Sequence, residues 1–210
     1  LGMIPEGWRV TTLGDISEKP QYGYTASATS EPVGPRFLRI TDINKRDWIE
    51  WQHVPFCPID ERDMRKYRLA KGDLVIARMA DPGHGALIEE DVDAVFASYL
   101  IRFRPLESNL ARYLQYWLRS DSYWGLVRSR QSGTTRANLN AQVLSAFTLV
   151  VPTLEILGAF AKQADGIRNK LVANVGMSLT LTELRDALLP RLLTGASEVN
   201  NIDRIIGRAL

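Results

Sequence analysis

The stretch that decides the fold is LEILGAFAKQADGIRNKLVANVGMSLTLTELRDALLPRLL, residues 154–193, near the C-terminus. It holds no proline before Pro190 and no cluster of turn-forming residues, so it predicts one uninterrupted helix. A helix of about 40 residues is about 60 Å long at 1.5 Å per residue. Such a helix is longer than a domain built from the rest of the chain is wide, so one domain covers only part of it.

Apolar residues recur along this helix at spacings of three and four, as they do in the seam of a coiled coil. The register slips after Leu171, and the stripe resumes at Met177. Asn174 lies in line with the seam, where an amide sets the register more than it adds stability. The expected seam consists of Leu157, Phe160, Ala164, Ile167, Leu171, Asn174, Met177, Leu181, Leu184, Leu188 and Leu192.

Two glycines weaken the helix when it is considered by itself. Gly166 and Gly176 each cost roughly 1 kcal/mol relative to alanine, but glycines also permit a partner to approach closely. We therefore predict that the helix holds two chains together in a homodimer. The alternative, in which the helix folds back on its own domain, stays open.

The residues before the helix alternate between strand-like and helix-like patterns, which predicts an α+β protein with a mixed α/β domain. The domain is expected at residues 3–153, the helix at 154–194 and a tail at 195–210. Strands are expected at residues 36–43, 74–79, 94–104 and 146–151, and helices at 60–67 and on both sides of Ser120 within 109–131. The expected core residues are Trp8, Leu13, Ile40, Leu74, Ile76, Phe96, Leu100, Phe103, Trp117 and Phe147.

The composition is that of one globular domain with an appendage. The 210 residues are 45% apolar and 24% charged, which excludes a disordered chain. No apolar run approaches the roughly 20 residues that a membrane-spanning helix needs. Cys57 is the only cysteine, so no internal disulfide forms, and a reducing cytoplasm is the expected location.

Charge is unevenly distributed along the chain. Residues 101–140 carry seven arginines and two acids, whereas residues 81–93 carry five acids and neither lysine nor arginine. This pattern predicts a basic face that meets phosphates and a separate acidic face. The alternative is that both segments are ordinary solvated surface.

The sequence contains no motif for catalysis. It has no glycine-rich phosphate-binding loop, and Asp81-Pro82-Gly83 only begins like the motif of an adenine methyltransferase. His53, Cys57 and His84 are too scattered for a zinc site. We therefore expect no catalytic residue, no metal site and no enzymatic activity in this chain.

Eight segments in the same order resemble one half of the specificity (S) subunit of type I restriction–modification enzymes. They are PEGWRVTTLGDI (5–16), YGYTASA (22–28), FLRITDI (37–43), YRLAKGDLVIAR (67–78), SYLIRFRP (98–105), SGTTRANLN (132–140), LVVPTLE (149–155) and LRDALLPRLLTG (184–195). The family usually shows a PPLxEQ run where this chain has Pro152-Thr153-Leu154-Glu155-Ile156-Leu157. The missing glutamine puts in doubt any contact that this residue makes in the family.

The resemblance implies a function that composition does not. A typical S subunit carries two target-recognition domains, each followed by a long helix, and each domain reads half of a split DNA site. This chain has one domain and one helix, so it resembles a half-subunit that pairs with a second copy through antiparallel helices. The implied partners are double-stranded DNA and the methyltransferase (M) and restriction (R) subunits. S-adenosylmethionine, ATP and Mg²⁺ would bind to those subunits.

DNA reading needs polar side chains on loops, together with arginine and lysine to hold phosphates. We favour the segment from Arg128 to Asn138, and we expect Gly23 to let the backbone approach DNA between two aromatic side chains. Packing on the domain or plain surface exposure is the alternative for each candidate. The candidates are Tyr22, Tyr24, Thr25, Lys45, Arg46, Arg78, His84, Arg128, Arg130, Thr134, Thr135, Arg136 and Asn138.

Two other functions stay open. The chain is either a DNA-reading subunit or a scaffold that binds methyltransferase subunits without reading DNA, and the basic cluster favours reading. A recognition module once fused to a methyltransferase is the third hypothesis.

Overall fold

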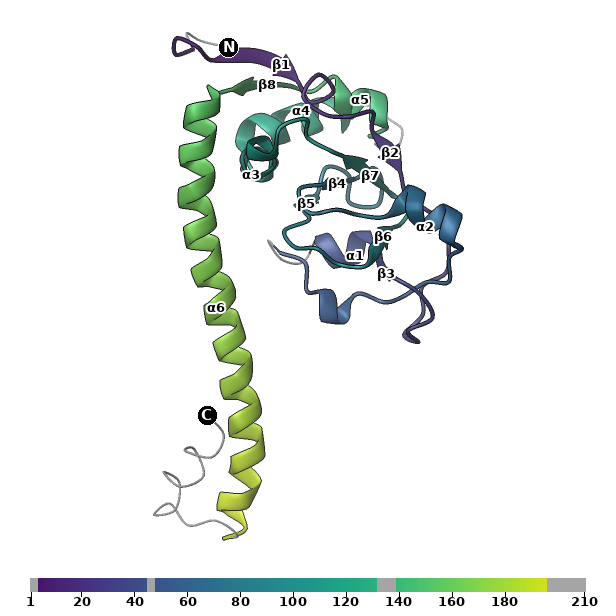
Figure 1. Cartoon of the computed structure of the whole chain (residues 1–210), viewed down its shortest axis with the longest axis vertical. Helices are drawn as coiled ribbons and strands as arrows, with labels where there is room; N and C mark the ends of the chain where they lie inside the picture. Colours follow the sequence, from purple (N-terminus) through teal and green to yellow (C-terminus); the bar gives the residue numbers. More distant parts are fainter. Residues whose placement is uncertain (1–3, 45–47, 132–138, 196–210) are drawn as a thin grey trace. The chain divides into compact units, whose positions relative to one another are not determined.

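The computed structural model describes residues 4–44, 48–131 and 139–195 (Figure 1). The chain divides into two compact units between Ala161 and Lys162. The first turns of the long helix, α6 (Leu154–Leu193), therefore belong to the globular unit. No helix of the described ranges is long and apolar enough to cross a membrane.

A four-stranded antiparallel sheet lies at the centre of the globular unit. Its order is β2 (Gln21–Tyr22), β7 (Leu100–Phe103), β4 (Leu74–Ala77) and β5 (Gly85–Leu87). Leu74 and Ile76 enter one hydrophobic cluster, whereas Val75 and Ala77 enter another. Successive side chains of a strand point to opposite faces, so the unbroken apolar run of β4 reflects burial on both sides.

Helices cover the first face of this sheet (Figure 1). They are α3 (Ser108–Trp117), α4 (Asp121–Gln131) and α5 (Ala141–Ser145). The antiparallel pair of β1 (Arg9–Thr12) and β8 (Thr148–Val151) adjoins them and leads into α6. Leu157 of α6 is 1% exposed and completes the same cluster.

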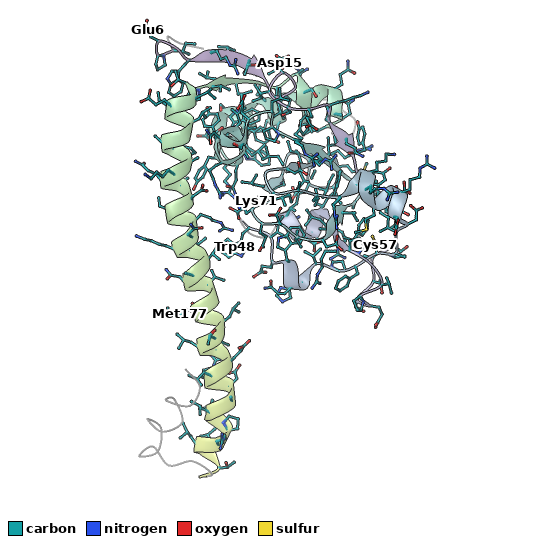
Figure 2. All side chains as sticks on the ribbon, viewed as in Figure 1. Glu6, Asp15, Trp48, Cys57, Lys71 and Met177 are labelled. Atoms are coloured by element: carbon teal, nitrogen blue, oxygen red, sulfur yellow. The ribbon has the colours of Figure 1, made fainter. Side chains whose placement is uncertain are left out.

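Shorter elements cover the second face. β3 (Arg36–Leu38) pairs in parallel with β6 (Ala94–Phe96), and both pack with α1 (Ile40–Ile43), α2 (Glu61–Tyr67) and the 3-10 turn η1 (Trp51–His53). A smaller cluster around Phe37, Cys57 and Val95 lies beside them (Figure 2 labels Cys57).

The sequence predicted the helices better than the strands. The expected helix at 60–67 is α2, and the expected break at Ser120 separates α3 from α4, where Ser120 Oγ accepts from the Tyr123 N–H at 3.2 Å. The mixed α/β class and the long helix are confirmed. The short helix α5 was missed; Asn140 caps it by accepting from the Val143 N–H at 2.9 Å.

Two strand predictions were wrong. Residues 36–43 are not one strand, because Asp42 accepts from both the backbone and the guanidinium of Arg39 and starts α1 there. Residues 94–104 form two strands in different sheets, since the Leu100 N–H donates to Ala97 O at 2.9 Å and closes a turn. Of the expected core residues, Trp8 and Ile40 are only half-buried.

The described part of the basic segment 101–140 does not form one continuous basic face. Asp73, which is 1% exposed, accepts from Arg104 Nε at 2.7 Å and Nη2 at 2.9 Å. Arg102 lies 4.0 Å from the same carboxylate. Arg112 pairs with Glu89 across the two segments. Strand pairing and helix packing bring these arginines beside acids that lie far from them in sequence.

Asp73 also sets the charge environment of its neighbours. Its hydrogen bond raises the pKa of Arg104, whereas burial lowers the pKa of Arg102 despite the nearby carboxylate. Asp73 additionally accepts from the Ala70 N–H at 2.9 Å, which fixes the turn before β4. One carboxylate therefore holds the start of β4 against β7.

We expect Asp73→Ala to lower the free energy of unfolding by about 3–5 kcal/mol, because it removes the buried carboxylate shared by Arg102 and Arg104 and leaves only the exposed Glu18, 3.9 Å from Arg104, as a counter-charge. Urea unfolding of the full chain measures this. The matched control is Asp93→Ala, whose exposed pair with Arg68 at 2.7 Å is worth about 1 kcal/mol or less. Equal unfolding midpoints for the two variants would contradict a structural role for Asp73.

Candidate nucleic-acid interface

One end of the central sheet brings together three of the described DNA-reading candidates, Tyr22, Arg78 and His84. Ala77 pairs with Leu100, Ile76 with Gly85 and Tyr22 with Ile101. In this antiparallel register Tyr22, Arg78, His84 and Tyr99 all stand at the same end of neighbouring strands. Residues that lie far apart in the sequence therefore share one surface.

The loop that joins β4 to β5, residues 78–84, forms the middle of this end and is named the β4–β5 loop. Ala80 has φ 63°, a left-handed conformation that costs a residue with a Cβ roughly 1–2 kcal/mol. Gly83 has φ 97°, and a Cβ there would lie 3.0 Å from the methyl groups of Val127. The loop is thus held in one strained conformation against α4.

Helix α4 supplies the contacts that hold the loop. The buried hydroxyl of Tyr123 donates to Gly83 O at 2.7 Å, and burial raises the pKa of this phenol. The ring of Trp124 meets the ring of His84 edge-on, with centroids 5.0 Å apart. His84 Nδ1 lies 2.8 Å from Asp81 Oδ1, without the alignment of a hydrogen bond. These contacts give His84 a part in shaping the loop.

Hydrogen bonds also join the loop to Asn44 and Leu139, which flank the remaining candidates in the sequence. Asn44 Nδ2 donates to Asp81 Oδ2 at 3.1 Å, and the Leu139 N–H donates to Arg78 O at 3.0 Å. Asn44 directly precedes residues 45–47, and Leu139 directly follows residues 132–138. Lys45, Arg46, Thr134, Thr135, Arg136 and Asn138 themselves lie outside the described residues.

Arg128 and Arg130 lie at the end of α4 and are exposed. Neither forms an ion pair with another residue of the described ranges, unlike Arg102, Arg104 and Arg112 of the same basic segment. These two cations without ion-pair partners among the described residues thus lie on the helix that holds the β4–β5 loop.

Arg78 and Tyr22 form a stacked pair at the centre of the site. The guanidinium carbon of Arg78 lies 5.1 Å from the centroid of the Tyr22 ring. The Tyr22 hydroxyl accepts from the Ala141 N–H at 3.0 Å, which fixes the far end of the ring. The pair therefore joins β2, β4 and α5.

Two expectations about the loop at residues 22–25 need correction. The ring of Tyr24 is half-buried and packs against Tyr67, with centroids 5.3 Å apart, in the cluster around Cys57. A Cβ on Gly23 would lie 2.3 Å from the carbonyl oxygens of Phe96 and Ala97. The glycine therefore permits a close approach of the protein's own backbone rather than of DNA. Thr25 is exposed.

Sequence analysis missed Tyr99. Its ring is 55% exposed, and its carbonyl oxygen accepts from the Arg78 N–H at 3.0 Å. The sequence pattern placed it inside one long strand, whereas it stands at the turn between β6 and β7. If a turn had been predicted at Ser98-Tyr99, Tyr99 would have been expected to be an exposed aromatic residue.

The predicted helix seam divides into two parts. Leu157 is in the core of the globular unit, and Phe160 meets the rings of Tyr113 and Tyr116 with centroids 6.2 and 5.3 Å away. Leu157 is therefore unavailable to a dimer seam, which corrects that assignment, whereas Phe160 is half-buried by its own domain. Ala164 is also buried.

The rest of the seam is largely uncovered. Ile167, Leu171, Met177 and Leu181 are 68%, 41%, 63% and 58% exposed (Figure 2 labels Met177). Leu184, Leu188 and Leu192 are half-buried, and Asn174 is exposed. The described residues contain no group of three or more His, Cys, Asp or Glu side chains that could hold a metal ion.

Known proteins resemble this chain along most of its length. It is 24% identical over 204 residues to the Type I restriction enzyme HindI specificity subunit of Haemophilus influenzae, covering 91% of this chain and 42% of that protein. The putative MjaX specificity subunit of Methanocaldococcus jannaschii is also 24% identical, with 92% and 47% covered. The chain thus spans about half the length of these relatives.

Solved structures show the same fold. The S subunit from M. genitalium superposes with a TM-score of 0.65 at 13% identity, covering 89% of this chain and 46% of that one. The HsdS subunit of Thermoanaerobacter tengcongensis gives 0.53 at 19% identity, covering 90% and 45%. Residues 5–165 match the family described as Type I restriction modification DNA specificity domain. The chain therefore belongs to the family of type I restriction–modification DNA specificity domains.

Proposed function

We propose that this chain reads one half of a bipartite DNA site for a type I restriction–modification complex. The observation that carries the proposal is the convergence of Tyr22, Arg78 and His84 on the end of the sheet around the β4–β5 loop. Direct readout needs side chains held in fixed positions at the protein surface. The strained, bonded loop provides such positions.

Charge supports the same surface. Arg128 and Arg130 follow the loop-contacting residues of α4 and have no carboxylate partners among the described residues, so their charge is available to phosphates. Phosphate contacts orient a protein on DNA, and contacts to base edges supply the specificity. The proposed arrangement places both kinds of group at one end of one sheet.

The uncovered seam of α6 supports pairing of two copies. Apolar side chains that are half or more exposed in a single chain become buried when two such helices pack. A two-fold axis is the commonest symmetry of such pairs, and it would present two identical recognition domains to inverted half-sites. The helix, about 60 Å long by its rise per residue, would fix the spacing between them.

Catalysis would belong to other subunits of the complex. The relatives are named as specificity subunits of restriction enzymes, and we propose that this chain likewise acts with methyltransferase and restriction subunits. S-adenosylmethionine, ATP and Mg²⁺ would bind there. This chain would contribute recognition without catalysis.

Removing the unbalanced cations should flatten the salt dependence of DNA binding. Each phosphate contact contributes about 0.9 to the slope of log K against log salt, so Arg128→Ala with Arg130→Ala should lower the slope by up to about 1.8. Titration of a mixed-sequence duplex at several salt concentrations measures it. The control, Arg62→Ala with Arg65→Ala on α2, removes the same charge elsewhere. Equal slopes in wild type and the α4 variant would contradict the proposal.

Pairing through α6 is tested by the mass of the full chain in solution. We expect a dimer at micromolar concentration and a monomer for Leu181→Lys, since each copy loses about 1.5–3 kcal/mol of leucine burial. Leu179→Lys is the matched control, because Leu179 is 53% exposed and lies on the opposite side of the helix, about 200° around. A monomeric wild type, or equal dissociation of both variants, would refute the pairing.

A further inference from the structure

Arg78 differs from Arg36, Arg39 and Arg104 of the globular unit in what its guanidinium contacts. Arg104 holds Asp73 with two nitrogens, and Arg39 holds Asp42 in the same way. Arg36 donates to Val54 O at 2.5 Å. The guanidinium of Arg78 faces the Tyr22 ring instead, and its Nε is buried without a hydrogen-bond partner among the described residues. No hydrogen bond or ion pair of the Arg78 guanidinium is formed with another residue of the described ranges.

The position of Arg78 is fixed on three sides. Its N–H donates to Tyr99 O at 3.0 Å, and its carbonyl oxygen accepts from the Leu139 N–H at 3.0 Å. The side chain is half-buried, and its guanidinium carbon lies 5.1 Å from the Tyr22 ring centroid. An arginine restrained before binding loses less conformational entropy when it binds.

Tyr22 is restrained in turn. Its backbone pairs with Ile101 in the central sheet, and its hydroxyl accepts from the Ala141 N–H at 3.0 Å. The next residue, Gly23, lies so close to the backbone of residues 96–97 that no side chain fits there. The Tyr22 ring is therefore held in a fixed position, and the guanidinium of Arg78 stacks over it.

The geometry determines which nitrogens of Arg78 can donate to a ligand. Because Nε is buried, the two Nη groups are the nitrogens that can reach a ligand. Their parallel N–H bonds match two adjacent acceptors, such as O6 and N7 of guanine in the major groove. They also match two oxygens of a phosphate. Adenine offers an acceptor beside a donor, so it fits this pair poorly.

We propose that Arg78, stacked on Tyr22, reads a guanine in the half-site. This inference rests on the proposed function and names one base pair within it. The stacked pair stands at the end of the sheet, where the carbonyl oxygen of Arg78 also accepts from the Leu139 N–H. A fixed, planar donor pair suits a base edge, whereas phosphates are commonly met by side chains as exposed as Arg128 and Arg130.

The test is selection of bound sequences from a random duplex library by the full-length chain. Wild type should yield a motif with an invariant G·C pair. Arg78→Ala should keep the other positions, lose the preference at that pair and bind the matched duplex roughly 10- to 100-fold more weakly. Arg78→Lys should lose the same preference, because an ammonium lacks the planar pair of donors.

Two further variants separate reading from packing. Tyr22→Phe keeps the ring and should keep the motif. Tyr22→Ala removes the ring on which Arg78 stacks and should weaken the preference for that G·C pair. Arg128→Ala, the charge control, should weaken binding to all sequences equally. Thermal unfolding of each variant shows whether it is folded, and Arg78→Lys retains a cation over the ring if Arg78→Ala does not fold.

The outcomes are distinguishable. Uniformly weaker binding by Arg78→Ala with an unchanged motif would assign Arg78 to a phosphate and overturn the inference. Unchanged motif and affinity would leave Arg78 as a structural contact and also overturn it. A wild-type motif without an invariant G·C pair would do the same while sparing the proposed function. A wild type that binds every sequence equally would overturn both.

Discussion

The structure depends on the burial of both faces of one short strand, β4. Its alternating side chains enter two separate hydrophobic clusters, so the helices on one face and the small strands on the other are assembled around the same four residues. The buried carboxylate of Asp73 stands immediately before this strand and binds Arg104 of the segment that follows β7. Because β4 is held on both faces, its C-terminal end is also fixed, and the candidate interface lies at that end.

The end of β4 connects the core to the candidate recognition surface. The chain leaves the strand at Arg78 and passes through the left-handed residue Ala80 before it returns as β5. Tyr123 and Trp124 hold this turn from the helical side, and Asn44 holds it from α1. Strain of this kind persists only where the surroundings over-determine the conformation. The same contacts give the side chains of the loop a defined direction.

The features that the sequence predicted are those with a local cause. The length of α6 follows from the spacing of its apolar residues and the absence of breakers, and the break at Ser120 follows from capping chemistry. Non-local contacts explain the failures. Residues 94–104 are mostly apolar and read as one long strand, but β6 and β7 pair with partners in different sheets. Gly23 and Tyr24 looked like an exposed loop, but the chain around residues 96–97 and Tyr67 packs against them. The arginines of residues 101–140 suggest one basic face in the sequence, but Asp73 and Glu89 pair with three of them in the fold.

The central claim is that this chain determines which DNA sequence its complex recognises, and that two copies present identical domains. Sequencing of DNA methylation in the native cell, with and without the gene, tests this most directly. The account predicts that deletion abolishes adenine methylation at one bipartite motif whose two halves are identical and inverted. A methylation pattern that is unchanged by the deletion would contradict the account.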